Sequence, residues 1–158
     1  TISPCGLYRY RLTRTWDGTI DPLVFVMLNP STADAHIDDP TIRRCIGYAK
    51  REGCGGIVVV NLMAWRATKP GELFKVNDPV GPMNLDVLLT ALAGLDRAVV
   101  AWGGHRSARM PFSRPSIDMV QACVGEMVCL GVSERNGSPF HPLMQPKNTP
   151  LIPWCPLA

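Results

Sequence analysis

Six consecutive apolar residues, Leu23-Val24-Phe25-Val26-Met27-Leu28, run directly into the polar turn Asn29-Pro30-Ser31. A strand that is apolar at every position is covered on both faces, as in a parallel sheet flanked by helices. Proline has no backbone N–H to give to a central ladder, so the strand ends at this turn. The stretch therefore predicts a buried inner strand of an α/β sheet.

Apolar runs and helical patterns alternate along the rest of the chain. Further buried strands are predicted at 57–60, 98–102 and 127–130, and helices at 40–52, 83–95 and about 116–124. Residues 7–16 alternate large apolar or aromatic side chains with arginines, which is typical of an edge strand. We expect one domain over residues 1–158, with a three-layer α/β/α fold. Its sheet is predicted to be four-stranded and mostly parallel, with an N-terminal edge strand or hairpin added.

The overall composition fits a single folded domain of 158 residues, of which 46% are hydrophobic. No apolar run approaches the roughly 18 residues of a membrane span, so no membrane association is expected. The N-terminal residues Thr1-Ile2-Ser3-Pro4 do not resemble a signal peptide, which favours the cytoplasm. The net charge of +3 permits a polyanionic partner without requiring one.

Cysteine and histidine spacing gives no sign of a metal or another cofactor. None of the six cysteines forms a C-x-x-C pair, so free thiols are favoured. An iron–sulfur cluster has no support from the spacing of its four candidate ligands, Cys5, Cys45, Cys54 and Cys155. The three histidines are not spaced as metal ligands. For the acidic pair Asp38 and Asp39, capping of the helix that begins at Pro40 is favoured over metal binding.

Polar residues follow each predicted buried strand. In an open α/β sheet, ligands bind in the crevice outside the carboxyl ends of the strands. The residues found there are Asn29-Pro30-Ser31, Asn61, Gly103-Gly104 and His141. An asparagine amide is both donor and acceptor, so Asn61 can pair with the edge of a nucleobase. Trp65 and Phe140 are candidates to stack on the faces of that base.

Several of these segments resemble uracil-DNA glycosylases. Residues 56–67 are similar to the strand whose asparagine reads the pyrimidine edge, here Asn61. Residues 99–104 are similar to the Leu-Trp-Gly segment of that superfamily, and Asn29-Pro30-Ser31 to its water-positioning motif. His141-Pro142 matches the His-Pro motif whose histidine stabilises the departing base. The resemblance spans roughly residues 23–142 and implies a uracil-DNA-glycosylase-like fold.

Two shorter segments, 27–34 and 38–45, resemble an uncharacterised bacterial and phage family, the domain of unknown function 1643. Two positions depart from the glycosylase pattern. Leu143 follows the His-Pro pair where a serine is usual, and Asn29 stands in place of an aspartate that activates water. An asparagine can position a water molecule, but it is a poor base.

The glycosylase resemblance implies a role for each residue. Asn29 holds the attacking water with help from Asp34, and His141 donates a hydrogen bond to the departing base. Asn61 reads the base, while Trp65 or Phe140 stacks on it. Contacts to DNA phosphates are expected from Ser31, Arg43, Gly103, Gly104, Arg106 and Ser138.

We therefore expect a DNA N-glycosylase that flips a damaged or modified base, a pyrimidine by resemblance, out of the helix and hydrolyses its N-glycosidic bond. The expected partner is DNA and the expected oligomeric state is a monomer. Two alternatives stay open. One is an enzyme that hydrolyses or binds a free nucleotide or nucleoside, and the other is a non-catalytic module that binds nucleic acid.

Overall fold

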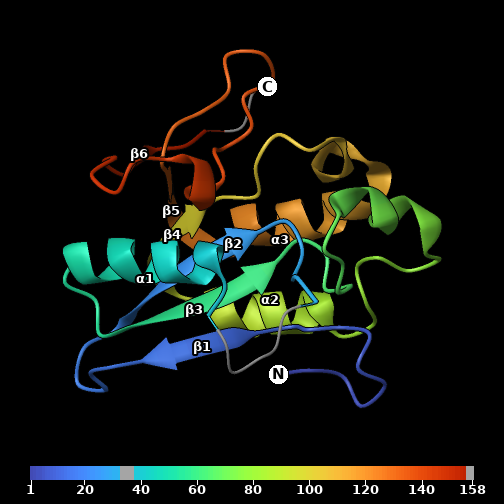
Figure 1. Cartoon of the computed structure of the whole chain (residues 1–158), viewed down its shortest axis with the longest axis horizontal. Helices are drawn as coiled ribbons and strands as arrows, with labels where there is room; N and C mark the ends of the chain where they lie inside the picture. The colour runs from blue at the N-terminus through green and yellow to red at the C-terminus, as the bar shows by residue number, and fades with distance from the viewer. Residues whose placement is uncertain (33–37, 156–158) are drawn as a thin grey trace.

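A computed structural model describes residues 1–32 and 38–155 of the chain. Within this part the chain forms a mixed sheet of six strands with three α-helices packed against it (Figure 1). The strands are β1 (Leu12–Thr15), β2 (Pro22–Met27), β3 (Gly56–Asn61), β4 (Leu95–Val100), β5 (Val124–Cys129) and β6 (Ile152–Pro153). The helices are α1 (Pro40–Arg51), α2 (Asn84–Leu92) and α3 (Arg114–Cys123).

The strand order is β1-β3-β2-β4-β5-β6. The four inner strands pair in parallel, as their apolar sequences predict. Both edges are antiparallel, since β1 pairs with β3 and β6 pairs with β5. The N-terminal edge strand is confirmed, although it covers only part of the predicted range 7–16. The predicted sheet lacked β6, so a mixed six-stranded sheet replaces the expected arrangement.

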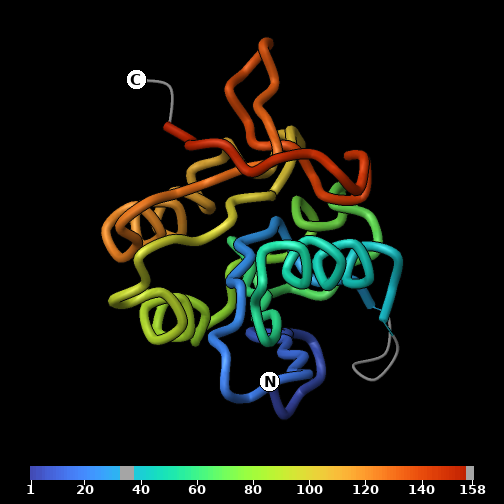
Figure 2. Tube along the Cα trace, turned by 90° about the vertical axis from the view of Figure 1, so that its left-hand side faces the viewer, coloured from blue at the N-terminus to red at the C-terminus, as the bar shows by residue number. Residues whose placement is uncertain are grey.

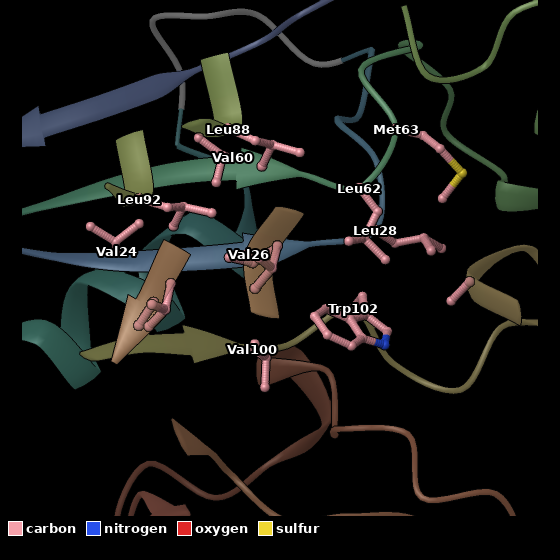
Figure 3. Close-up of a cluster of buried hydrophobic side chains, with 14 of the residues drawn as sticks. Val24, Val26, Leu28, Val60, Leu62, Met63, Leu88, Leu92, Val100 and Trp102 are labelled. Carbon is pink, nitrogen blue, oxygen red and sulfur yellow. The ribbon is translucent and has the colours of Figure 1, made fainter. Parts of the chain in front are cut away.

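Side chains alternate between the two faces of the sheet along β2 and β3. Val24, Val26 and Val60 face the layer that contains α2 and α3, and Figure 3 shows Leu88 of α2 close to Val60. Phe25 and its neighbours at alternate positions pack against α1 on the opposite face. Figure 2 shows the sheet between these two helical layers. The predicted α/β class is therefore confirmed, with helices on both faces of a mixed sheet.

Helix α1 begins where the Asp-Pro sequence predicts. The carboxylate of Asp39 accepts a hydrogen bond from the backbone N–H of Ile42 at 2.8 Å, and Pro40 is the first helical residue. The neighbouring Asp38 instead forms an ion pair with Arg14 at 2.8 Å. The described residues contain no group of acidic, histidine and cysteine side chains arranged to hold a metal ion.

Helix α2 ends at Leu92, three residues before the predicted boundary, and β4 begins at Leu95. Gly94 between them has a φ of +76°, a conformation that favours glycine and ends a helix. Strand β5 likewise begins at Val124, directly after α3. The sheet is therefore longer at its amino ends than the apolar runs alone predict.

None of the six cysteines forms a disulfide bond. Of the helices that the structure describes, none combines the length and the apolar character needed to cross a bilayer.

Candidate functional site

A cavity of about 390 Å³ lies at the carboxyl ends of β2, β3 and β4. This volume is within the range of small-molecule sites in proteins. The cavity brings together residues that follow different strands and are far apart in sequence. All seven residues predicted from the strand ends line it: Asn29, Pro30, Ser31, Asn61, Gly103, Gly104 and His141.

Asn61 ends β3 and is only 4% exposed. It continues the face of the sheet that carries Val59, so its side chain lies on the same side as α1 and lines the cavity. Its backbone carbonyl accepts a hydrogen bond from the amide of Asn84 at 3.0 Å. Helix α2, on the face of the sheet opposite α1, therefore holds the main chain at Asn61, while the side-chain amide lines the cavity.

The residue after Asn61 is fixed in the same way. The carbonyl of Leu62 accepts a hydrogen bond from Asn84 at 3.1 Å and another from the hydroxyl of Ser116 at 2.7 Å. Both donors are fully buried, one in α2 and one in α3. Two helices on the far face of the sheet therefore set the position of the strand end.

His141 lies at the start of a short 3-10 helix, Pro142–Met144. Its Nδ1 accepts the backbone N–H of Leu143 at 3.3 Å, so the neutral ring carries its proton on Nε2. Burial lowers the pKa of His141, and the nearby carboxylate of Asp39 opposes this effect. Gly103 has a φ of +76°, a conformation that favours glycine, and a Cβ added there would be in ordinary contact with the Cβ of His141 at 3.4 Å.

A second histidine, His105, lines the same cavity. Its Nδ1 accepts the backbone N–H of Ser107 at 3.3 Å and contacts the hydroxyl of Ser107 at 2.8 Å. Burial and then the cations Arg106 and Arg109 lower the pKa of His105. His105 is not among the predicted site residues, although its position just after the Gly103-Gly104 turn is a signal for it.

Asn29 uses its side-chain N–H groups to hold the loop after β2. They donate to the carbonyl of Ala67 at 2.9 Å and to the carbonyl of Pro30 at 3.1 Å. The side-chain oxygen is the group that Asn29 can still offer to a ligand or a water molecule. The side chain of Asn29 therefore links two loops at the rim of the cavity by hydrogen bonds.

Two charged residues of the cavity wall are absent from the predicted site, namely Arg9 and Asp39. Arg9 is only 7% exposed. Its pKa is lowered by burial and by the cation of Arg66, while Asp39 raises it. Asp39 accepts a hydrogen bond from the hydroxyl of Ser31 at 3.1 Å. Helix capping, the role predicted for Asp39, does not prevent its carboxylate from facing the cavity.

The two predicted stacking residues do not line the cavity. The Trp65 ring packs edge-on against Tyr8, with ring centroids 5.4 Å apart. The Phe140 ring covers Gly131, where an added Cβ would lie 2.8 Å from it. Trp102, which follows β4, is the tryptophan that lines the cavity, and it packs edge-on against Trp154.

The remaining predicted contacts lie around the cavity or apart from it. Arg106 lies over the ring of Phe74 at 4.4 Å, and Arg43 is exposed on α1. Ser138 is buried and lines a second cavity of about 420 Å³, which shares Trp102 with the first. The predicted helper Asp34 lies outside the described residues.

The stability of the fold is expected to decrease as the pH falls below about 6.5, the ordinary pKa of histidine. Burial lowers the pKa of His105 and His141, so the unfolded chain binds protons on these rings more readily than the folded protein. The contribution of these two rings to the free energy of unfolding is fully present above about pH 6.5. It decreases as the pH falls from there toward the lowered pKa values of the folded protein. Thermal unfolding at pH 7.5 and 5.5 should show a smaller difference in Tm for a His105→Gln/His141→Gln double variant. An equal difference in both proteins would contradict the expectation.

One comparison with known proteins gives a match. A family model described as "Protein of unknown function (DUF1643)" matches residues 9–143. No curated protein and no solved structure matches the chain.

Proposed function

The chain belongs to the DUF1643 family of proteins of unknown function, and we propose that it is a DNA N-glycosylase. Its substrate is a damaged or modified base, preferentially a pyrimidine, whose N-glycosidic bond it hydrolyses. The observation that carries the proposal is the convergence of the Asn61 amide and the His141 ring on one cavity at the strand ends. We further propose that it acts in the cytoplasm as a monomer.

In this reaction the target nucleotide leaves the helix and its base enters the cavity, because the glycosidic bond is shielded inside the stack. Asn61 pairs with the edge of the base through its amide donor and acceptor. As the bond breaks, negative charge develops on the base, and the N–H on Nε2 of His141 donates to the oxygen that gains it. A neutral histidine suits this role, and burial lowers the pKa of His141.

The surface beside the cavity favours DNA over a free nucleotide. Leu143 is 40% exposed and Met144 is 78% exposed, and they come directly after the His141-Pro142 pair. Proteins that kink or open a duplex insert apolar side chains of this kind between base steps. A neighbouring hollow of about 480 Å³ is lined by the cationic side chains of Arg43, Arg44 and Lys147, which suits a phosphate backbone.

One observation favours the alternative, a hydrolase that acts on a free nucleotide. Arg9 places a buried guanidinium in the wall of the cavity. A guanidinium recognises phosphate oxygens well, whereas a neutral base makes less use of it. In this second candidate, the phosphate of a mononucleotide occupies the part of the cavity beside Arg9.

The test is a search for abasic sites in duplexes that carry uracil, mismatched bases or hypermodified pyrimidines. We expect the purified protein to release at least one of these bases, and its DNA binding to weaken steeply as salt rises. The same bases supplied as free nucleotides are the matched control. Release from nucleotides alone would support the alternative, and salt-sensitive binding without any release would indicate a non-catalytic module.

A further inference from the structure

Hydrolysis of an N-glycosidic bond needs a group that accepts a proton from the attacking water. Asn29 cannot do so effectively, because an amide is a very weak base, and its N–H groups already donate to Pro30 and Ala67. His141 carries its proton on Nε2, the nitrogen that the reaction needs as a donor. Within residues 1–32 and 38–155, Asp39 is the one carboxylate that lines the cavity.

The carboxylate of Asp39 is held in a fixed orientation. Its Oδ1 accepts the backbone N–H of Ile42 at 2.8 Å, and its Oδ2 accepts the hydroxyl of Ser31 at 3.1 Å. Each carboxylate oxygen has two lone pairs, so each retains one acceptor position after these contacts. Asp39 is therefore oriented by the protein and is still able to accept a hydrogen bond from water in the cavity.

The charges around Asp39 also suit a reacting centre. The cation of Arg9 lines the same cavity, and the carboxylate of Asp39 raises the pKa of Arg9 against the lowering effect of burial. The His141 ring lies within electrostatic reach of the carboxylate, which opposes the lowering of the His141 pKa. A carboxylate at this position also stabilises the positive charge that develops on the sugar as the base departs.

We infer that Asp39 is the general base of this site, an inference that rests on the proposed glycosylase function. The water oxygen forms a bond to C1′ of the sugar as the bond from C1′ to the base nitrogen breaks. The electron pair of that bond leaves with the base, whose charged oxygen is held by His141. The water proton passes to the carboxylate of Asp39. Asn29 then contributes only its side-chain oxygen to the position of the water.

Two substitutions separate this role from helix capping. Asparagine and serine both cap helices about as well as aspartate, so Asp39→Asn and Asp39→Ser are expected to keep the start of α1 and the Tm. Single-turnover base release should fall about 10²-fold in both variants, because general base catalysis is lost. The affinity for intact substrate DNA should change less than about threefold, which assigns the effect to the chemical step.

Asp38→Asn is the matched control. It removes the adjacent carboxylate, which pairs with Arg14 and does not line the cavity, so its rate of base release should equal that of the wild type. Titration of His141 by NMR adds a readout that is independent of turnover. Loss of the Asp39 carboxylate should lower the pKa of His141, whereas Asp38→Asn should leave it nearly unchanged.

The outcomes distinguish the inference from the function on which it rests. Base release by the wild type with undiminished rates in Asp39→Asn or Asp39→Ser would overturn the role of Asp39 and leave the glycosylase proposal standing. An unchanged pKa of His141 in Asp39→Asn would also overturn it, because the carboxylate would then not face the reacting centre. If the wild type releases no base from any duplex, the proposed function itself fails and the role of Asp39 fails with it.

Discussion

Replacing His141 with alanine is expected to slow base release by about 10³-fold, the upper range for loss of one donor to a developing charge. His141 lines the cavity and is partly buried, so a hydrogen bond from the N–H on Nε2 to a charged oxygen is worth more there than in solution. The fold should survive, because the ring accepts a hydrogen bond of 3.3 Å from the N–H of Leu143, and this exposed residue can bond to water instead.

His141→Gln and His105→Ala make this test specific. Glutamine can present an N–H near the position of Nε2, so His141→Gln should recover part of the lost rate. His105 has the same kind of local hydrogen bond and lines the same cavity, so its replacement is the closest match that the chain offers. We expect His105→Ala to weaken substrate binding more than it slows the chemical step. Equal losses of single-turnover rate in both alanine variants would contradict the assignment of the donor to His141.

The sheet was predictable where strands are buried on both faces. Leu23 to Leu28 and the run at 57–60 are apolar at every position because helices cover both sides, and this pattern leaves one interpretation. β6 was not predictable, since Ile152 and Pro153 form only a two-residue strand and are exposed. Its position depends on contacts such as the hydrogen bond from the N–H of Trp154 to the carbonyl of Met127.

The site was predictable where a residue ends a strand or belongs to a recognisable motif. Asn61 was found because it ends β3, and His141 because the His-Pro pair marks it in the loop after β5; the fold brings both to one cavity. Arg9 was not, because it reaches the cavity through the antiparallel pairing of β1 with β3. That pairing places the residues before β1 beside the chain after β3, and the N–H of Arg9 donates to the carbonyl of Ala64 at 2.9 Å.

Trp65, by contrast, was predicted to belong to the site but does not line the cavity. It follows Asn61 by four residues, so a stacking role beside the base was a reasonable interpretation of the sequence. The chain after β3 turns away, however, and the N–H of Ala64 donates to the carbonyl of Val80. The Trp65 ring is thereby directed to Tyr8. Closeness in sequence was a poor guide here, since the direction of the loop depends on partners that are distant along the chain.

Replacing Asn61 with alanine is expected to reduce kcat/KM for the preferred base by about 10³–10⁴-fold. A base in this cavity has given up its hydrogen bonds to water, and without the Asn61 amide its polar edge is left unpaired, which is the costly case. The effect should be largest for the preferred base and small for bases that the wild type already rejects. The loss of discrimination therefore identifies Asn61 as the residue that reads the base.

The structure also indicates how to separate this effect from damage to the fold. The contacts that hold the strand end are made by the backbone carbonyls of Asn61 and Leu62, so Asn61→Ala leaves the hydrogen bonds from Asn84 in place. Asn84→Ala is the matched structural control, because it removes those bonds and keeps the Asn61 amide. We expect Asn84→Ala to lower the Tm while preserving the order of preference among bases. We expect Asn61→Ala to keep the Tm and to lose that order of preference. If Asn61→Ala kept the wild-type preference, the amide would not read the base, whatever the total loss of rate.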